Sequence, residues 1–306
     1  PIALISVIMT FANMIDMLTV NPCIKAAMKG SPHTFDNLLS DKLTTDMLPN
    51  FIYGSYTGLA VTVFGLVPTI TAMFGKSILP SLAESCAKND KKAMQSGLTK
   101  MLIVTSIIAI PAGMGIAVLS EPILRFLFGG RETEIQVCIM PMSILGIAVI
   151  FLAIATPCFA ILQTLGKPHK AIIIMLAGGI IKLFLNIILI RQPIINISGA
   201  AISTLVSEVF ICVLSVRSVC KMTDLKPKVS EIFVKPTYAA IMCSVTAILS
   251  HETLTKIAHL QINHRFVTLF SIGIGSTMYF FCLYLLCETP KNIVNCIFSK
   301  KNPQNP

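Results

Sequence analysis

The chain has 306 residues, of which 54% are hydrophobic and 12% are charged, and its mean hydropathy is +0.80. Soluble domains carry about 25% charged residues, so this composition indicates an integral membrane protein and excludes a soluble enzyme. The formal net charge of +10 does not require a nucleic-acid partner, because lysine gathered in cytoplasmic loops explains it in a membrane protein. We therefore expect membrane lipid, and no nucleic acid, around this chain.

Eight stretches are long and apolar enough to cross a bilayer, which takes about 20 helical residues. In chain order they cover residues 2–20, 51–74, 97–119, 137–165 and 171–190, a sixth that begins at residue 198, then 234–249 and 267–287. The polar stretch 21–50 predicts a solvated loop, and Pro68 predicts a kink in the second span. Residues 121–130 predict a short helix in the membrane interface. The fold class is therefore all-α and polytopic, with about eight transmembrane helices.

Lysine and arginine are divided unevenly between the two ends of these spans. Fifteen of them follow the second, fourth, sixth and eighth spans, and eight lie on the opposite side. Because cytoplasmic loops carry the excess of positive charge, we expect both ends of the chain in the cytoplasm. Asp16 is then expected near the outer end of the first span.

The fifth and sixth spans carry charged residues in segments that otherwise belong in lipid. Gly178, Lys182 and Asn186 follow one another at i, i+4 spacing and share one helix face. The short link after this helix predicts an antiparallel partner, which carries a polar stripe of Gly199, Ser203, Ser207, Ala200, Thr204 and Glu208. Lys182 lies 11 residues past Ala171 and Glu208 lies 10 past Ser198, so both are expected at mid-depth. A charge there costs at least about 2.5 to 3.5 kcal/mol, so neither side chain should face lipid.

Two interpretations of Lys182 stay open at this point. In the first, Lys182 forms an internal ion pair with Glu208 that fixes the two helices of the hairpin together, since a lone buried charge is unfavourable. In the second, Lys182 contacts the transported cargo directly. We predict Lys182, Asn186 and Glu208 as a substrate-binding or gating group.

The first two spans carry further polar candidates. Asn13 and Asp16 form a cation or proton site, or Asp16 is simply hydrated near the outer interface. On the second span Tyr56, Thr57 and Thr62 either pack against other helices or, with Ser203 and Thr204, line a cavity.

No metal or cofactor site is expected from the sequence. The ten cysteines include no CxxC pair, and the five histidines have no metal-ligand spacing. A membrane-embedded glycosyltransferase would need clustered acidic residues at a membrane face to hold a divalent metal, and no such pair occurs in the loops. We therefore expect a protein that is not an enzyme.

Several stretches together resemble a known family. They are 1–20 (PIALISVIMTFANMIDMLTV), 53–61 (YGSYTGLAV), 67–85 (VPTITAMFGKSILPSLAES), 127–130 (LFGG), 162–171 (LQTLGKPHKA), 180–190 (IIKLFLNIILI) and 197–208 (ISGAAISTLVSE). In this order they are similar to the second half of the multidrug/oligosaccharidyl-lipid/polysaccharide (MOP) flippase superfamily. The likeness is greatest to its polysaccharide branch of stage V sporulation protein B type, relatives of the lipid II flippase MurJ.

The resemblance implies a MATE-like fold with two six-helix lobes and two trailing helices. Residues 1–222 would form the C-terminal lobe, 223–290 the two trailing transmembrane helices and 291–306 a cytoplasmic polar tail. The chain begins with Pro1 and has no signal peptide, so we expect a fragment or split product whose N-terminal lobe is absent.

The resemblance also implies a function. The family carries lipid-linked (polyprenyl-pyrophosphate) saccharide or peptidoglycan precursor across the cytoplasmic membrane by alternating access, with Na⁺ or H⁺ as a possible coupling ion. A cation-coupled multidrug or toxin antiporter on the same fold is the alternative. MurJ lines its cavity with several arginines, and the second span here has none, so the resemblance leaves the cargo open.

Overall fold

The computed structural model describes residues 2–30, 44, 46–88, 90–192, 194–224, 230–258 and 264–286. Within these ranges it describes only the backbone of residues 2–13, 30, 74–75, 230–231, 257–258 and 264–265. Every secondary-structure element in the described part is helical, which confirms the all-α prediction. The elements are α1 (Ile2–Gly30), α2 (Leu48–Ser55), the π-helix η2 (Tyr56–Val61), α3 (Thr62–Phe64), α4 (Leu66–Ala87), α5 (Lys91–Val118), α6 (Ser120–Phe128), α7 (Glu132–Thr164), α8 (Pro168–Leu189), α9 (Ser198–Thr223), the π-helix η3 (Ser230–Val234), α10 (Lys235–Ala258) and α11 (His264–Leu286).

Seven helical runs in the described part are long and apolar enough to cross a membrane. They correspond to the second through eighth predicted spans, and the first predicted span lies within α1. The short interfacial helix predicted at 121–130 is α6, which ends just before Gly129. The chain is therefore a multi-pass helical membrane protein.

Two boundaries differ from the sequence-based expectation. The predicted loop 21–50 begins too early, because α1 continues through Pro22 to Gly30. Its last turns pack Cys23, Ile24 and Ala27 into the interior, and this burial stabilises the longer helix. The rest of the predicted loop falls largely outside the described residues. The second span is interrupted at η2 and at Gly65 rather than kinked at Pro68. Pro68 lies in the first turn of α4, where its missing N–H is tolerated.

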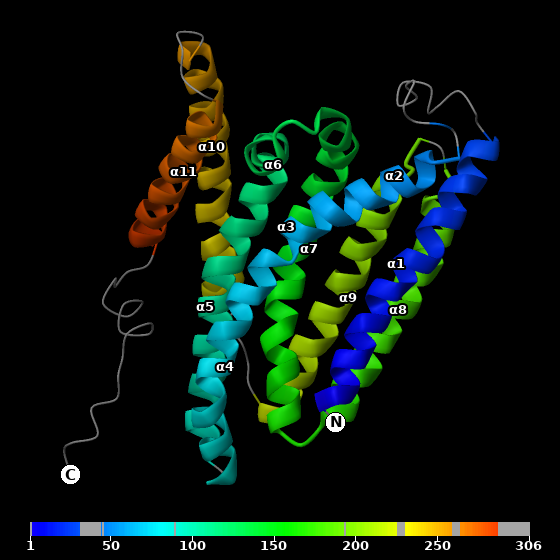
Figure 1. The fold of residues 1–306 in the computed structure, drawn as a ribbon. Helices are drawn as coiled ribbons and strands as arrows, with labels where there is room; N and C mark the ends of the chain where they lie inside the picture. The colour runs from blue at the N-terminus through cyan, green and yellow to red at the C-terminus, as the bar shows by residue number, and fades with distance from the viewer. Residues whose placement is uncertain are drawn as a thin grey trace.

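The bundle is arranged around α7 and α9. Helix α7 packs against α4, α5 and α9, while α8 joins α9 to α1, and α10 joins α5 to α11. Figure 1 shows α1 and α8 side by side at one edge, α7 and α9 in the middle, and the α10–α11 pair at the opposite edge. The trailing pair is attached to the body by α5, where the Tyr279 hydroxyl donates to the Ile107 carbonyl at 2.9 Å.

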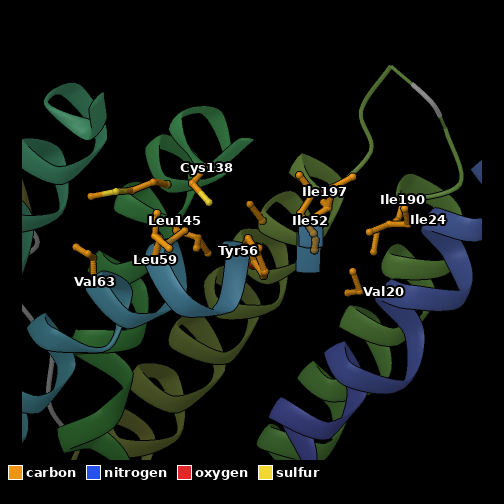
Figure 2. Close-up of a cluster of buried hydrophobic side chains, with 14 of the residues drawn as sticks. Val20, Ile24, Ile52, Tyr56, Leu59, Val63, Cys138, Leu145, Ile190 and Ile197 are labelled. Carbon is orange, nitrogen blue, oxygen red and sulfur yellow. The ribbon is translucent and has the colours of Figure 1, made fainter. Parts of the chain in front are cut away.

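A hydrophobic core joins α1, α2, η2, α7 and the α8–α9 connection at one end of the bundle (Figure 2). Its members include Ile24, Tyr56, Leu145 and Ile197, each at most 5% exposed. Outside the bundle the surface is also apolar. One face of α8 presents Ile173, Leu176, Ile180, Phe184 and Ile188, which are 48% to 62% exposed. Such a continuous exposed apolar stripe needs lipid around it.

Glycines set the distance between α5 and α7. A Cβ on Gly146 would lie 2.5 Å from the Ala117 backbone nitrogen, and one on Gly113 would lie 2.6 Å from the Gly146 carbonyl oxygen. The Ser143 hydroxyl donates to the Ala117 carbonyl at 2.8 Å beside them. Small residues allow this backbone-to-backbone approach, which is typical of helix pairs in membranes.

We predict that Gly146→Ala destabilises the protein by about 1–3 kcal/mol, because the added methyl group meets backbone atoms that cannot move aside. Thermal unfolding of the detergent-solubilised protein measures the effect. Gly115→Ala is the matched control, since a Cβ on Gly115 has no atom within 4 Å. Equal unfolding temperatures for the two variants would contradict the close packing of α5 on α7.

Candidate functional site

The α8–α9 hairpin forms the frame of the site. The predicted antiparallel arrangement is confirmed, because Ser203 pairs with Asn186 while Ser207, one turn later, donates to the Gly178 carbonyl at 2.9 Å. A Cβ on Gly178 would lie 2.4 Å from side-chain atoms of Ile211, so glycine leaves room for the Ile211 side chain of α9 against α8. The two polar faces predicted from the sequence therefore meet each other inside the bundle.

Helix α1 completes the site by placing an acid beside the lysine. Lys182 Nζ lies 2.7 Å from Asp16 Oδ2, and both side chains are 12% exposed. Asp16 lies near the middle of α1, and Lys182 lies past the middle of α8, so the pair is deep within the bundle. In a low-dielectric interior, such a close and well-formed contact compensates both charges.

Asn186 ties the pair to both neighbouring helices. Its Nδ2 donates to Asp16 Oδ1 at 2.9 Å and contacts Thr19 Oγ1 at 3.1 Å. Its Oδ1 accepts from the Ser203 hydroxyl of α9. Asn186 and Ser203 are fully buried, so one amide links α1, α8 and α9. Both Asp16 carboxylate oxygens are thereby occupied, one by an ammonium and one by an amide.

The structure corrects two expectations about these charges. The Lys182–Glu208 ion pair is wrong, because Lys182 pairs with Asp16 and no hydrogen bond or ion pair of Glu208 is seen in the described ranges. The hydrated position of Asp16 near an outer interface is also wrong. Asp16 is 8% exposed, because its carboxylate faces Lys182 and Asn186 of α8.

The residues predicted to line a cavity are mostly interior. Tyr56 is 1% exposed and packs in the core with Leu59 and Leu145 (Figure 2), so it is not on a cavity wall. Ser203 and Thr204 are also buried. Only Thr57 and Thr62 reach the surface, and their hydroxyls bond to carbonyls of their own helix at 2.9 Å. Asn13 belongs to α1, but its side chain lies outside the described residues.

Sequence reasoning missed Thr19 and the role of Asp16. The signal was present: Asp16 and Thr19 are three residues apart and share a helix face. The sequence contains an acid in each of two spans for one mid-span lysine, and the expected position of Asp16 near the outer end of its span favoured Glu208 as the partner.

A separate cavity of about 750 Å³ lies between the body and the trailing helices. Its charged lining comprises Glu121, Arg125, Glu132 and Glu252. Arg125 forms two ion pairs: its Nε lies 3.0 Å from Glu121 Oε1, and its Nη1 lies 2.5 Å from Glu132 Oε2. None of its lining residues belongs to α1, α8 or α9, so it is distinct from the Lys182 site.

The multi-pass helical bundle holds a charged pair in its interior, and charged groups at this depth mark a candidate functional site. Its fold is that of the MOP superfamily. A solved MOP superfamily transporter from Pyrococcus furiosus aligns with 97% of this chain and 65% of its own, at 15% identity and a TM-score of 0.51. The family model of the lipid II flippase MurJ matches residues 51–269, more than half of the chain. The chain belongs to this family, which confirms the resemblance drawn from its motifs.

Two curated relatives show the extent of the likeness. The lipid II flippase MurJ of Bacillus subtilis (strain 168) is 26% identical over 136 residues, 44% of this chain and 25% of its own length. Stage V sporulation protein B of the same organism is 23% identical over 182 residues, 58% of this chain and 34% of its own length. The chain thus spans about a quarter to a third of the length of these two relatives.

We predict that Lys182→Met destabilises the protein by roughly 3–5 kcal/mol, because it leaves the Asp16 carboxylate without its cation. Chemical or thermal unfolding in detergent measures the loss. Lys167→Met is the control, since Lys167 is an exposed lysine at the start of the same helix. An equally small effect in both variants would show that the interior pair adds nothing to stability.

Proposed function

We propose that this chain is the transmembrane part of a flippase that translocates a lipid-linked (polyprenyl-pyrophosphate) saccharide or peptidoglycan precursor across the cytoplasmic membrane. The match of residues 51–269 to the lipid II flippase family carries this proposal. The activity is transport with no covalent change in the cargo, so the protein is not an enzyme.

Alternating access supplies the mechanism. Residues 1–222 form a six-helix lobe that rocks against a second lobe, and residues 223–290 supply the two trailing helices. The tight contacts at Gly113, Gly146 and Gly178 favour movement of the lobe as a body. The π-helix η2 and the break at Gly65 interrupt the second span, and such irregularities often mark functional hinges in helices.

Within this mechanism Lys182, Asn186 and Asp16 act as a gating group. A pyrophosphate headgroup needs cationic donors in its binding cavity, but the charge of Lys182 is already compensated by Asp16 at 2.7 Å. Direct contact with the headgroup would require Lys182 to leave Asp16. The geometry therefore favours control of the contact between α1 and α8–α9 over a permanent place in the cargo site.

The orientation follows from the charged ends of the helices. Lys88, Lys91, Lys170 and Lys221 lie at the end of the bundle that holds the α4–α5 turn, the start of α8 and the end of α9. We assign this end to the cytoplasm of a cell membrane by the positive-inside rule. Both chain termini lie on that side in this topology, and H⁺ or Na⁺ is the coupling ion.

The flippase mechanism predicts that Lys182→Met abolishes translocation of a fluorescent polyprenyl-pyrophosphate saccharide. The measurement uses proteoliposomes that contain the natural protein purified from its host. The paired exchange Asp16→Lys with Lys182→Asp restores the ion pair with reversed polarity. If Lys182 gates through its pair, the exchange recovers a substantial part of the rate, whereas a folded but inactive exchange variant assigns direct headgroup contact to Lys182. Full activity of folded Lys182→Met would remove this residue from the mechanism.

The cargo class is tested in the same vesicles. We expect the labelled lipid-linked saccharide to reach the opposite leaflet at least tenfold faster than in empty vesicles, measured by loss of fluorescence on external quenching. A cationic dye loaded under a proton or sodium gradient reports the antiporter alternative. Gradient-driven dye export without lipid translocation would overturn the flippase proposal.

A further inference from the structure

Among the described side chains, Asp16, Glu208 and Lys182 place two carboxyl groups and one ammonium group within the bundle. Asp16 has partners for both oxygens. Glu208, near the middle of α9, has a fully buried oxygen, Oε2, without a hydrogen-bond partner. Its chain neighbour Ser207 donates to the carbonyl of Gly178, one turn before Lys182 on α8. Buried polar atoms without partners are rare and call for an explanation.

The balance of positive and negative charge within the bundle explains why Glu208 Oε2 has no partner. One ammonium compensates one carboxylate, and a second ionised carboxylate would be uncompensated in the membrane interior. Helix α9 packs mainly against α7 and α8. On α8, Lys182 lies one turn past Gly178, which accepts a hydrogen bond from Ser207 of α9. The charged residues of α7, Glu132 and Glu134, lie in its first turn, far from mid-depth. Lys182 is already paired with Asp16, so an ionised Glu208 would have no compensating cation among these groups.

We propose that Asp16 and Glu208 share a single proton and that Lys182 pairs with whichever of the two is ionised. In the arrangement described here the proton is on Glu208 and Lys182 binds Asp16. In the alternative arrangement the proton is on Asp16, and the Lys182 ammonium binds Glu208. One proton leaves one carboxyl group and reaches the other, Lys182 stays charged throughout, and the net charge of the three groups is zero in both arrangements.

The local geometry suits this exchange. Lysine carries its ammonium on a flexible four-carbon stem, which lets it turn from α1 toward α9 without moving the α8 backbone. The Asn186 amide can donate to an Asp16 oxygen in both protonation states. The exchange would break the only ionic link between α1 and α8 among the described residues.

This inference rests on the proposed function in one respect: it makes H⁺ the ion that drives the gate. The two carboxyl groups then bind the proton alternately, and the position of Lys182 reports the state of the gate. Its test needs no transport measurement, so it can succeed or fail independently of the flippase activity.

The first experiment is a double-mutant cycle read by thermal unfolding. Asp16→Asn imitates a protonated Asp16 and releases Lys182 to Glu208, so we expect only a small drop in the unfolding temperature. Glu208→Gln imitates a protonated Glu208 and should change the unfolding temperature little. The double variant leaves Lys182 without a carboxylate and should lose much more than the sum of the two single losses. Additive losses would overturn the proposal.

Glu84→Gln provides the matched control for the cycle. Glu84 is an exposed carboxylate paired with Lys88 on α4, so its combination with Asp16→Asn should be additive. Coupling of equal size in this control pair would mean that the cycle does not report on Lys182, and the proposal would lose its support.

The second experiment observes the proton directly and needs no double variant. Infrared difference spectroscopy of the protein in lipid nanodiscs at neutral pH should show the carbonyl band of a protonated carboxyl group. The band should vanish in Glu208→Gln, and it should also vanish in Asp16→Asn because Glu208 is then ionised by Lys182. An absent band in the unsubstituted protein, or a band that persists in Asp16→Asn, would refute the shared proton.

Discussion

The structure depends on one charged contact placed where charges are most expensive. Lys182 and Asp16 meet at 2.7 Å between α8 and α1, and each would be strongly unfavourable in hydrocarbon without the other. This requirement ties α1 to the α8–α9 hairpin and buries Asn186 and Ser203 as the groups that complete the contact. The remaining apolar surface of α8 then faces lipid, and the helix has one charged interior face and one hydrocarbon face.

Close packing makes that contact possible. Helices in lipid gain little from burying apolar surface against one another, so small residues that let backbones approach supply much of the association. Gly178 brings α9 onto α8, and Gly146 brings α7 onto α5. The α8–α9 crossing leaves Asn186 and Ser203 buried between these helices. A rigid lobe that contains a small set of exchangeable charges is a physically reasonable element for alternating access.

The candidate site was partly predictable. Lys182, Asn186 and Glu208 were predicted as one group from charge at mid-depth and i, i+4 spacing. The structure joins Lys182 and Asn186 through Asp16, and no hydrogen-bond partner of Glu208 Oε2 is seen in the described residues. Their joint role in transport stays a proposal. The identity of the acidic partner was not predictable, because Asp16 and Glu208 both lie on helices that could adjoin α8. Tyr56 looked like a cavity residue because it is polar, but its ring fills the core, as the amphipathic character of tyrosine allows.

The sequence by itself determined the class of protein, the number and order of its later spans and the family to which it belongs. These follow from the length of apolar runs and from local motifs, which do not depend on contacts between distant residues. Only the tertiary structure decided that Asp16, 166 positions from Lys182 in the chain, is its partner, and that Glu208 has no ion pair in the part of the chain that the structure describes. The reason is that partner choice depends on where α1 ends and on which face it turns toward α8, and both are set by long-range packing.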